Sequence, residues 1–490
     1  MVVGAGENFG QPHDYVSEGV PSFGQSGEYV YREAIIYDQL EEDLTDYYTE
    51  QGKTGEELTA LVAEGIEKAY KTELNAKAYV KVTPEGGEEV TIDAVPADTL
   101  RSMQGVALAA LVEGGYEENS EEETALKSYL GGELTVNRET ALAGYFDAES
   151  TGTLTSEVGD GSYTAYFGAK KVGSAVVAEG RETVVIDGLS GFDQMTVGED
   201  YPVTLYNEES GTAFVRDFKY VSKVIDEASD LAYFKITNDV DGQGNASNVS
   251  GNFDGYYVLG KDIDAAGNTH TTGINGIAVA NKVFIYNNFT DCGLTGTFDG
   301  NGHTISNLSI GSGGLFGVIN EGTVKNLGLS DISFYSSDAA ALAWYTYGGS
   351  IENVYIDVTE LPNKWARAAV AGNVHSTTKV ENLLVELGGT VSESALNGGY
   401  GSFTLHDGTF KNGDVVGSWN NVYIVSSTPC TVTSANKVID GENTSASAKY
   451  AGIKRYESYD EMKLDENDFA SFETSGYWSM EDGIPVFGAN

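Results

Sequence analysis

Residues 298–310 read FDGNGHTISNLSI. Gly and Asn alternate in the first half, and polar and aliphatic residues alternate in the second half. This pattern has the period of a strand and not that of a helix. Glycines that turn corners, with Phe298, Ile305, Leu308 and Ile310 directed to an interior, would account for both halves. The stretch therefore predicts a chain that bends tightly and then enters a short, half-buried strand.

One six-residue pattern at the end of this stretch occurs five times in the chain. It consists of an aliphatic or aromatic residue, any residue, Asn, an aliphatic residue, any residue and an aliphatic residue. The copies are ISNLSI at 305, VKNLGL at 324, IENVYI at 351, VENLLV at 380 and WNNVYI at 419. The Asn residues are separated by 19, 27, 29 and 39 residues. Uneven spacing around a constant short strand favours coils whose strands stack while their loops vary in length.

This repetition predicts a right-handed parallel β-helix over residues 227–490. Each coil would pair with the next at about 4.8 Å, and alternate residues would point into a shared core. Asn suits the bend between two strands because it tolerates the left-handed backbone conformation. Stacked bends would align the carboxamides in a hydrogen-bonded ladder. The predicted members are Asn307, Asn326, Asn353, Asn382 and Asn421.

Three further stretches carry a family resemblance: YYVLGKDIDAAGN at 256, LTGTFDGNGHTISNLSI at 294 and GGLFGVINEGTVKNLGL at 313. They resemble the GLUG-repeat proteins of bacterial cell surfaces, whose Gly-Leu-hydrophobic-Gly signature is matched by residues 314–317. The resemblance covers roughly residues 226–490. It implies a β-helix on an exterior surface, closed by YWSMEDGIPVF at 477 with Trp478 capping the stack. It implies no chemistry, because such repeats accompany unrelated activities.

The complete sequence predicts a mostly β protein of four parts. Residues 1–30 are expected to form an extended N-terminal arm, and residues 31–135 a small α+β domain. Within the latter, the apolar spacing predicts helices over 31–52, 54–70, 97–115 and 120–132 and a hairpin over 76–95. Thr54 and Glu57 have the spacing of a capping box. Residues 136–226 contain short strands between Gly-rich turns and resemble an immunoglobulin-like β-sandwich spacer. Residues 227–490 form the GLUG-type β-helix.

The charge of the chain excludes two classes of partner, and its first residues and its two cysteines leave further questions open. The chain has 74 acidic and 28 basic residues, a formal net charge of −46. Such a surface repels phosphates, so we expect neither nucleic-acid binding nor membrane insertion. The first residues lack the pattern of a signal peptide, which leaves open whether one was removed. Cys292 and Cys430 are too few for a disulfide framework, and the sequence does not decide whether they are bonded.

Calcium is the one cofactor for which the sequence offers candidate ligands. Asp239 and Asp241 stand at the first and third positions of a loop that resembles an EF-hand, but Ser250 replaces its final Glu. Asp262 and Asp264 form a second acidic turn. These four residues could hold a structural calcium ion. The alternative is two acidic turns that bind no metal, and no other cofactor is expected.

Catalytic motifs are absent from the sequence. The six-residue copies carry no repeated Asp for the paired carboxylates of a glycoside hydrolase. A lyase that acts on acidic sugars needs cationic side chains, and residues 227–490 contain two arginines. We therefore expect no enzyme and no catalytic residue. Trp344, Tyr345, Tyr347 and Tyr400 are candidates for stacking on sugar rings.

Together these features predict a non-enzymatic structural or adhesive protein on the outside of a bacterial cell. Its partners would be a surface glycan or protein of the host or of a bacterium. Residues 1–30 could also support self-association by strand addition. One alternative is a phage virion protein or a self-assembling filament subunit that uses this arm. The other is a β-helix protein that binds or degrades glycans.

Overall fold

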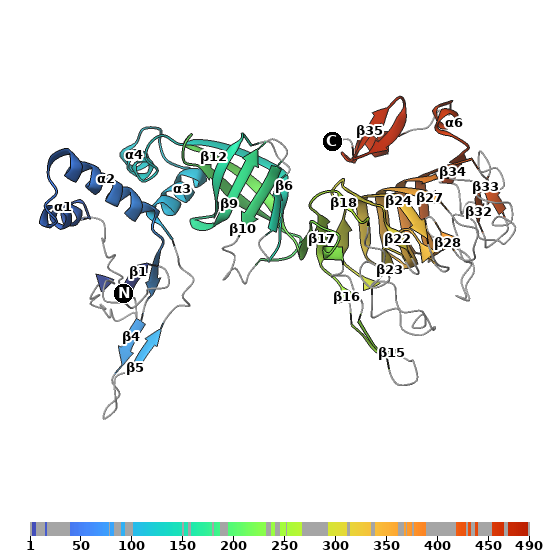
Figure 1. The fold of residues 1–490 in the computed structure, drawn as a ribbon, viewed down its shortest axis with the longest axis horizontal. Helices are drawn as coiled ribbons and strands as arrows, with labels where there is room; N and C mark the ends of the chain where they lie inside the picture. Colours follow the sequence, from blue (N-terminus) through green and yellow to red (C-terminus); the bar gives the residue numbers. More distant parts are fainter. Residues whose placement is uncertain are drawn as a thin grey trace. The chain divides into compact units, whose positions relative to one another are not determined.

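The fold was obtained from a computed structural model (Figure 1). It describes residues 2–5, 15–16, 40–77, 79–82, 90–93, 101–148, 151–154, 158–178, 181–186, 195–231, 237–240, 246–250, 252–266, 293–310, 314–334, 339–360, 367–368, 370–374, 377–388, 418–427, 430–432, 437–439, 453–464 and 469–488. Two compact units are present, Met1–Tyr220 and Val221–Asn490. The protein is mostly β, with its longer α-helices in the N-terminal unit. The finer division at residues 30, 135 and 226 stays a prediction.

The N-terminal unit begins with helices and short strands. They are β1 (Val2–Ala5), β2 (Tyr15–Val16), α1 (Leu40–Glu50), α2 (Gly55–Lys71), β3 (Leu74–Lys77), β4 (Tyr79–Val82), β5 (Val90–Asp93), α3 (Met103–Glu113) and α4 (Glu121–Ser128). Ser102 and Ser120 cap α3 and α4, since their hydroxyl oxygens accept hydrogen bonds from the backbone of Gly105 and Glu123 at 3.0 and 3.1 Å. The predicted helices and the hairpin are confirmed. Strand β1, within the predicted arm, pairs with β3 of its own chain.

The predicted capping box at α2 does not form. Thr54 has an extended backbone before the helix, but its side chain accepts no capping hydrogen bond. The Glu57 carboxylate, which the capping box would have used, instead forms an ion pair with the ammonium group of Lys53.

Seven strands of the N-terminal unit close into a barrel, so the predicted immunoglobulin-like sandwich is wrong. The strands are β6 (Thr135–Phe146), β7 (Thr151–Leu154), β8 (Gly161–Phe167), β9 (Lys170–Ala178), β10 (Arg181–Ile186), β11 (Asp200–Asn207) and β12 (Thr212–Tyr220). Their order around the barrel is β10-β7-β6-β12-β11-β8-β9, and β9 pairs with β10 to complete it. The ring is continuous through one parallel pair, β6 with β12, whereas a sandwich would leave two separate sheets. Strand spacing in the sequence is the same for both arrangements.

A buried arginine ties the parallel seam of this barrel. The side chain of Arg216 on β12 is fully buried. Its guanidinium donates to the carbonyl and side-chain oxygens of Asn137 at 2.9 and 3.2 Å and to the Glu139 carboxylate at 3.1 Å. Both partners lie on β6. Charge-assisted bonds thus join the two strands of this parallel pair, beside a shift of register between Val215 and Asp217.

The C-terminal unit is built on two parallel sheets. The long sheet follows the order β13 (Lys223–Ile225), β17 (Tyr256–Leu259), β20 (Thr297–Asp299), β24 (Thr323–Phe334), β27 (Ser350–Glu360), β30 (Lys379–Leu387), β31 (Ser418–Ser426) and β34 (Ile453–Tyr456), with β18 (Ile263–Asp264), β21 (Thr304–Ser306) and β22 (Ser309–Ile310) beside it. The second follows β16 (Asn252–Phe253), β19 (Gly293–Leu294), β23 (Phe316–Asn320), β26 (Ala343–Tyr347) and β29 (Ala371–Val374). Smaller pairs are β14 (Thr237–Val240) with β15 (Ala246–Ser250), β25 (Ala339–Ala340) with β28 (Arg367–Ala368), and β32 (Cys430–Val432) with β33 (Lys437–Ile439).

One apolar core lies between these sheets. Equivalent positions of successive strands are in register, as in the row Phe298, Val324, Ile351, Val380 and Trp419. Leu294, Phe316 and Ala343 of the second sheet belong to the same cluster. The four residues of the opening stretch that were predicted to face an interior are buried in it. Burying each large apolar side chain contributes roughly 1.5–3 kcal/mol, so the stacked rows are the main stabilising feature of this unit.

Four asparagines form a hydrogen-bonded ladder along one bend of the long sheet. Asn326, Asn353, Asn382 and Asn421 have φ angles of 53–54° in the left-handed region. Asn353 Nδ2 donates to Asn326 Oδ1 at 3.1 Å, Asn382 to Asn353 at 2.9 Å, and Asn421 to Asn382 at 3.2 Å. All amides donate in the same direction along the stack, so each bond polarises the next.

The ladder ends on a buried carboxylate. Asn326 Nδ2 donates to Asp299 Oδ1 at 2.9 Å, and the Asp299 side chain is almost fully buried. Asp299 also accepts hydrogen bonds from the Tyr256 hydroxyl and the Asn301 backbone, and Lys325 lies 3.3 Å away. Gly300, the next residue, packs against the backbone of Asn326: a Cβ there would lie 2.3 Å from the Asn326 carbonyl oxygen. Position 300 therefore requires Gly. Asp299 is the last acceptor of the ladder.

Asn307 lies on a second bend, apart from the other four. Strand β21 pairs with the later part of β24, so that Ser306 stands opposite Ser330. The next residues, Asn307 and Asp331, have φ angles of 58° and 52°. Asn307 Nδ2 donates to Asp264 Oδ1 at 2.9 Å and not to Asn326. The copy at 305 matches the later copies in sequence, but it pairs with a later part of β24 than the other copies do with their neighbours.

Removal of one ladder amide should destabilise the protein, because the neighbouring Asn side chains lose their hydrogen-bond partner. We expect Asn353→Gly, which keeps the left-handed backbone accessible, to lower the free energy of unfolding by about 1–3 kcal/mol. Asn353→Leu should cost about 1–2 kcal/mol more, because a side chain with a Cβ is strained at this φ. Chemical denaturation measures both. Asn420→Ala, at the exposed neighbouring position, should change stability by less than about 0.5 kcal/mol, and an equal loss there would contradict the ladder's role.

The terminal carboxylate should matter as much as any amide. Asp299→Asn keeps the shape but removes the charge that Tyr256, Asn326 and Lys325 approach. We expect a loss of about 1.5–3 kcal/mol in the free energy of unfolding, the usual value for hydrogen bonds to a charged group. Asp254→Asn, at an exposed position, is the matched control. Equal stability of the two variants in urea titrations would show that Asp299 does not anchor the ladder.

Candidate binding pocket

The outer face of the long sheet carries two in-register rows of side chains. The residues that alternate with the core point outward. One row is Gly328, Tyr355, Leu384 and Tyr423, and the next is Asp357, Glu386, Val425 and Tyr456. The first row is apolar and aromatic, and the second changes from acidic to apolar along the stack. A large apolar area would be exposed here if nothing covered it.

The C-terminal segment covers this face. It consists of α6 (Tyr459–Leu464), α7 (Ala470–Glu473) and the antiparallel hairpin of β35 (Trp478–Glu481) and β36 (Ile484–Phe487). Figure 1 draws α6 and β35 along one side of the sheet. Their residues form a second apolar cluster with the outer face, whose buried members are Leu384, Tyr423, Val425, Tyr456, Met462, Phe472 and Trp478. The segment is thus a third layer of the unit.

Trp478 belongs to this layer and does not cap the end of the stack. Its ring packs edge-on against Phe472 at 4.8 Å and Phe487 at 5.0 Å between ring centroids. Strand β34 is the last strand along the sheet order. The expectation drawn from the GLUG resemblance is therefore wrong, because Trp478 is buried in the apolar cluster on the outer face of the sheet.

The Asn ladder also holds the C-terminal segment. Asn421 Nδ2 donates to Ser471 Oγ at 2.8 Å, and Ser471 Oγ donates to Asn382 Oδ1 at 2.8 Å. Asn382 Nδ2 donates to the Ser471 carbonyl oxygen at 3.2 Å. Gly328 makes room for the other end of the segment, since a Cβ there would lie 3.0 Å from the ring of Phe487. Polar contacts at one end and ring packing at the other fix the position of the hairpin.

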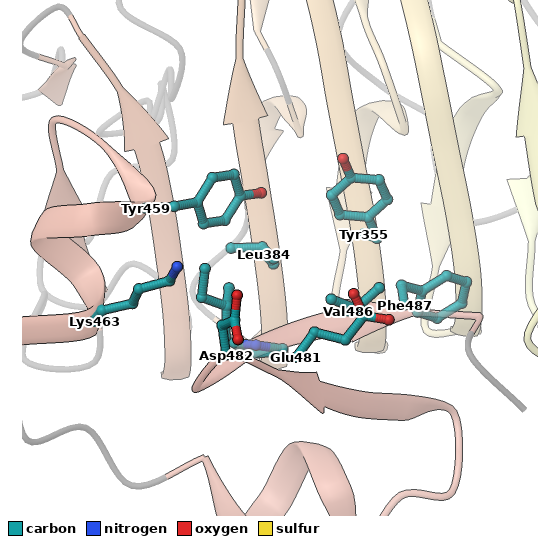
Figure 2. A pocket seen from close by; sticks show the side chains of 10 residues that line it. Tyr355, Leu384, Tyr459, Lys463, Glu481, Asp482, Val486 and Phe487 are labelled. Carbon is teal, nitrogen blue, oxygen red and sulfur yellow. The ribbon is translucent and has the colours of Figure 1, made fainter.

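A pocket of about 370 Å³ lies between the sheet and this segment (Figure 2). Tyr355 and Leu384 come from the sheet, and Tyr459 and Lys463 come from α6. The hairpin supplies Glu481, Asp482, Ile484, Pro485, Val486 and Phe487. The pocket therefore combines aromatic and aliphatic walls with three charged side chains.

Glu386 orients the two tyrosines. The hydroxyls of Tyr355 and Tyr459 both donate to Glu386 Oε2, at 3.1 and 2.9 Å. Burial, and secondly the Glu386 charge, raise the pKa of both tyrosines far above the usual value. Burial also raises the pKa of Asp357, and the charges of Glu386 and Asp331 raise it further against the hydrogen bond from the Asp331 backbone. The tyrosines stay protonated, and both of their protons are directed at one carboxylate.

The structure describes the side chains of two of the four predicted calcium ligands, Asp262 and Asp264, and both accept hydrogen bonds from the protein. Asp262 Oδ1 accepts from the Thr304 backbone at 2.8 Å and lies 3.4 Å from His303 Nδ1. Asp264 Oδ1 accepts from the Ala266 backbone and from Asn307, and these bonds lower the pKa of Asp264. Asp239 lies on β14 with its side chain outside the described residues, and Asp241 lies outside them entirely. Among the described residues, no three His, Cys, Asp or Glu side chains are arranged to hold a metal ion.

The predicted sugar-stacking residues are only partly described. Tyr347 is half-buried on β26, where its backbone carbonyl accepts from the Glu321 backbone at 2.9 Å. Trp344 and Tyr345 lie on the same strand, but their side chains are outside the described residues, as is all of Tyr400. Residues 344, 345 and 347 thus belong to the second sheet, whereas the pocket lies on the long sheet. Cys292 and the side chain of Cys430 are also outside the described part.

The pocket residues were missed in the sequence for a definable reason. Asp357 and Glu386 directly follow the copies IENVYI and VENLLV, so the acidic pair stands one residue beyond the pattern. Comparison of the outward positions of adjacent copies would have found it. Tyr459 and the hairpin come from 70–100 residues later in the chain, and no spacing in the sequence links them to the sheet.

Residues 205–358 match the family described as the M26 IgA1-specific metallo-endopeptidase N-terminal region. The matched region runs from β11 of the barrel to β27 of the long sheet. The chain is also 30% identical over 281 residues to halomucin of Haloquadratum walsbyi. The aligned region covers 54% of this chain and 3% of halomucin. A crystal structure of a candidate immunoglobulin A1 protease from Bacteroides ovatus is 14% identical, with a TM-score of 0.29 over 54% of this chain and 91% of that one.

The family match corrects three predictions. Residues 205–358 are similar to the N-terminal region of a metalloendopeptidase family, and this match replaces the resemblance to the GLUG-repeat surface proteins. The structural or adhesive function, with its phage and glycan alternatives, is replaced by this similarity to a protease-associated region. The expectation of no enzyme is corrected on the same ground. Asn-bearing strand repeats mislead here because they report how parallel strands stack, and a fold does not by itself indicate a function.

No helix in the described part of the chain combines the length and the apolar character needed to span a membrane.

Loss of the Glu386 carboxylate should loosen the C-terminal segment. We expect Glu386→Gln to lower the free energy of unfolding by about 1.5–3 kcal/mol, because two tyrosine hydroxyls lose a charged acceptor. The same substitution should lower the pKa of Asp357, since one of the charges that raise it is removed; NMR titration of the Asp357 carboxyl tests this. Glu381→Gln, exposed on the same strand, should change neither quantity. An unchanged Asp357 pKa in Glu386→Gln would contradict the arrangement.

Proposed function

We propose that this chain is a protease-associated region of the M26 type, which engages the protein substrate of a metalloendopeptidase. The observation that carries this proposal is the family match over residues 205–358. Because the family is described by its action on immunoglobulin A1, we take this immunoglobulin as the proposed partner. An immunoglobulin meets its proteases outside the cell, so the proposal includes an extracellular location on or near a bacterium.

We further propose that the C-terminal unit winds as a right-handed parallel β-helix. All five strands of the second sheet, β16, β19, β23, β26 and β29, are each followed along the chain by a strand of the long sheet. The order of strands is the same in both sheets, and the two share one core. Parallel crossovers are right-handed in nearly all proteins, which supports the proposed hand. A β-helix would give the substrate a stiff surface along which several contacts can act together.

Binding to immunoglobulin A1 tests the proposed function. Surface plasmon resonance with the full chain immobilised should give saturable binding of immunoglobulin A1 in the micromolar range, common for transient partners, and none of immunoglobulin G. Binding by each unit alone, Met1–Tyr220 or Val221–Asn490, shows which of the two contacts the immunoglobulin. Each fragment is first checked for cooperative unfolding. Equal responses to the two immunoglobulins, or no response at all, would contradict the proposal.

A cleavage assay separates substrate binding from peptide hydrolysis. Immunoglobulin A1 is incubated with the full chain in the presence of Zn²⁺ and, in parallel, with a chelator. Fragments that appear only with the metal would place the hydrolysis in this chain. Binding without fragments would limit its part to holding the substrate.

A further inference from the structure

We infer that the pocket between the long sheet and the C-terminal hairpin binds a cationic side chain, an arginine in the first place, displayed by a polypeptide partner. This deepens the proposed function, on which it rests for the partner being a protein. The pocket holds about 370 Å³, enough for one long side chain and too little for a folded element.

The polar groups of the pocket require a hydrogen-bond donor. The Tyr355 and Tyr459 hydroxyls donate their protons to Glu386, so their oxygens have only lone pairs left for a ligand. Glu481 and Asp482 at the hairpin turn are carboxylates and also accept. Lys463 is the only side-chain donor left among the ten lining residues, and it approaches no closer than 3.9 Å to its Asp460 partner.

The walls suit the remainder of an arginine side chain. The rings of Tyr355 and Phe487 are nearly parallel, with an interplanar angle of 18° and 6.5 Å between centroids. Tyr459 adds a third ring, and Leu384, Pro485 and Val486 supply aliphatic contacts for a methylene stem. A guanidinium is planar, stacks on aromatic faces and presents five donors, whereas an ammonium is a compact point charge.

The charge of the site favours the same ligand. Two carboxylates line the pocket beside one lysine, and the carboxylate of Glu386 accepts hydrogen bonds from both tyrosines. The complete chain carries a formal charge of −46, so cationic partners are attracted from a distance. Figure 2 shows Lys463 extended toward the pocket from α6. This lysine would compete with an incoming arginine for the same acceptors.

The experiment uses the full chain and three small probes: Nα-acetyl-arginine amide, Nα-acetyl-lysine amide and Nα-acetyl-citrulline amide. Citrulline has nearly the shape of arginine but no charge. Saturation-transfer NMR or calorimetry should give a millimolar Kd for the arginine probe, a weaker one for lysine, and at least tenfold weaker binding for citrulline. Raising NaCl from about 50 to 300 mM should weaken arginine binding several-fold.

Variants of opposite expected effect guard against misfolding as an explanation. Glu481→Gln combined with Asp482→Asn should weaken arginine binding about tenfold. Lys463→Gln, which removes the competing cation, should strengthen it several-fold, and a gain of binding cannot arise from unfolding. Glu56→Gln combined with Glu64→Gln removes the same charge from exposed positions of α2 and should leave binding unchanged.

Two results would overturn the inference: equal binding of the arginine and citrulline probes, or no gain in Lys463→Gln. Its failure is distinguishable from that of the proposed function. Immunoglobulin A1 binding that persists in the Glu481→Gln/Asp482→Asn variant, with no arginine binding to the native chain, would remove the pocket assignment alone. Arginine binding without any response to immunoglobulin A1 would remove the proposed partner and leave the pocket assignment standing.

Discussion

The C-terminal unit depends on one constraint: four long parallel strands, β24, β27, β30 and β31, must each bend at the same point with a residue in the left-handed conformation. Asn meets this requirement and also has a side chain that both donates and accepts. The four strands therefore share a one-directional chain of amide hydrogen bonds that ends on the buried carboxylate of Asp299. The apolar rows supply most of the stabilisation, but they would tolerate a shift along the stack. The ladder does not, because a displaced amide would lose two partners in a buried place.

The same register decides what the outside of the sheet presents. Because side chains alternate across a strand, neighbouring strands that align their core residues also align their outward residues. Tyr355 and Leu384 form one such row, and Asp357 and Glu386 form the next. The C-terminal segment is attached to this face by the ladder through Ser471 and by the packing of Trp478 and Phe487. The pocket is thus a product of stacking, since it lies where a covered apolar row meets an acidic one.

The match of residues 205–358 to the M26 family shows how a structural repeat can misdirect a functional interpretation. The six-residue copies are real, and they pair in register as parallel strands. Their composition reflects the demands of the coil, which are the same on a surface protein and beside a protease. The matched residues 205–358 include the end of barrel strand β11 and all of β12, which carry none of these copies. The similarity therefore extends beyond the repeat that suggested the fold.

Local signals in the sequence determined the elements of this protein, and tertiary pairing determined how they combine. Apolar spacing and turn residues were enough for helices α2 to α4, for the strands of the copies and for the left-handed Asn residues, because each depends on neighbours a few positions away. The barrel, by contrast, was expected as a sandwich, since the parallel contact of β6 with β12 joins segments about 75 residues apart. Asn307 shares the sequence pattern of the ladder but lies on another bend, because register and not composition assigns a residue to a turn. The pocket was decided only in three dimensions: Tyr355, Glu386 and Tyr459 come from three distant segments, and only the packing of the last onto the first two brings their hydroxyls and carboxylate together.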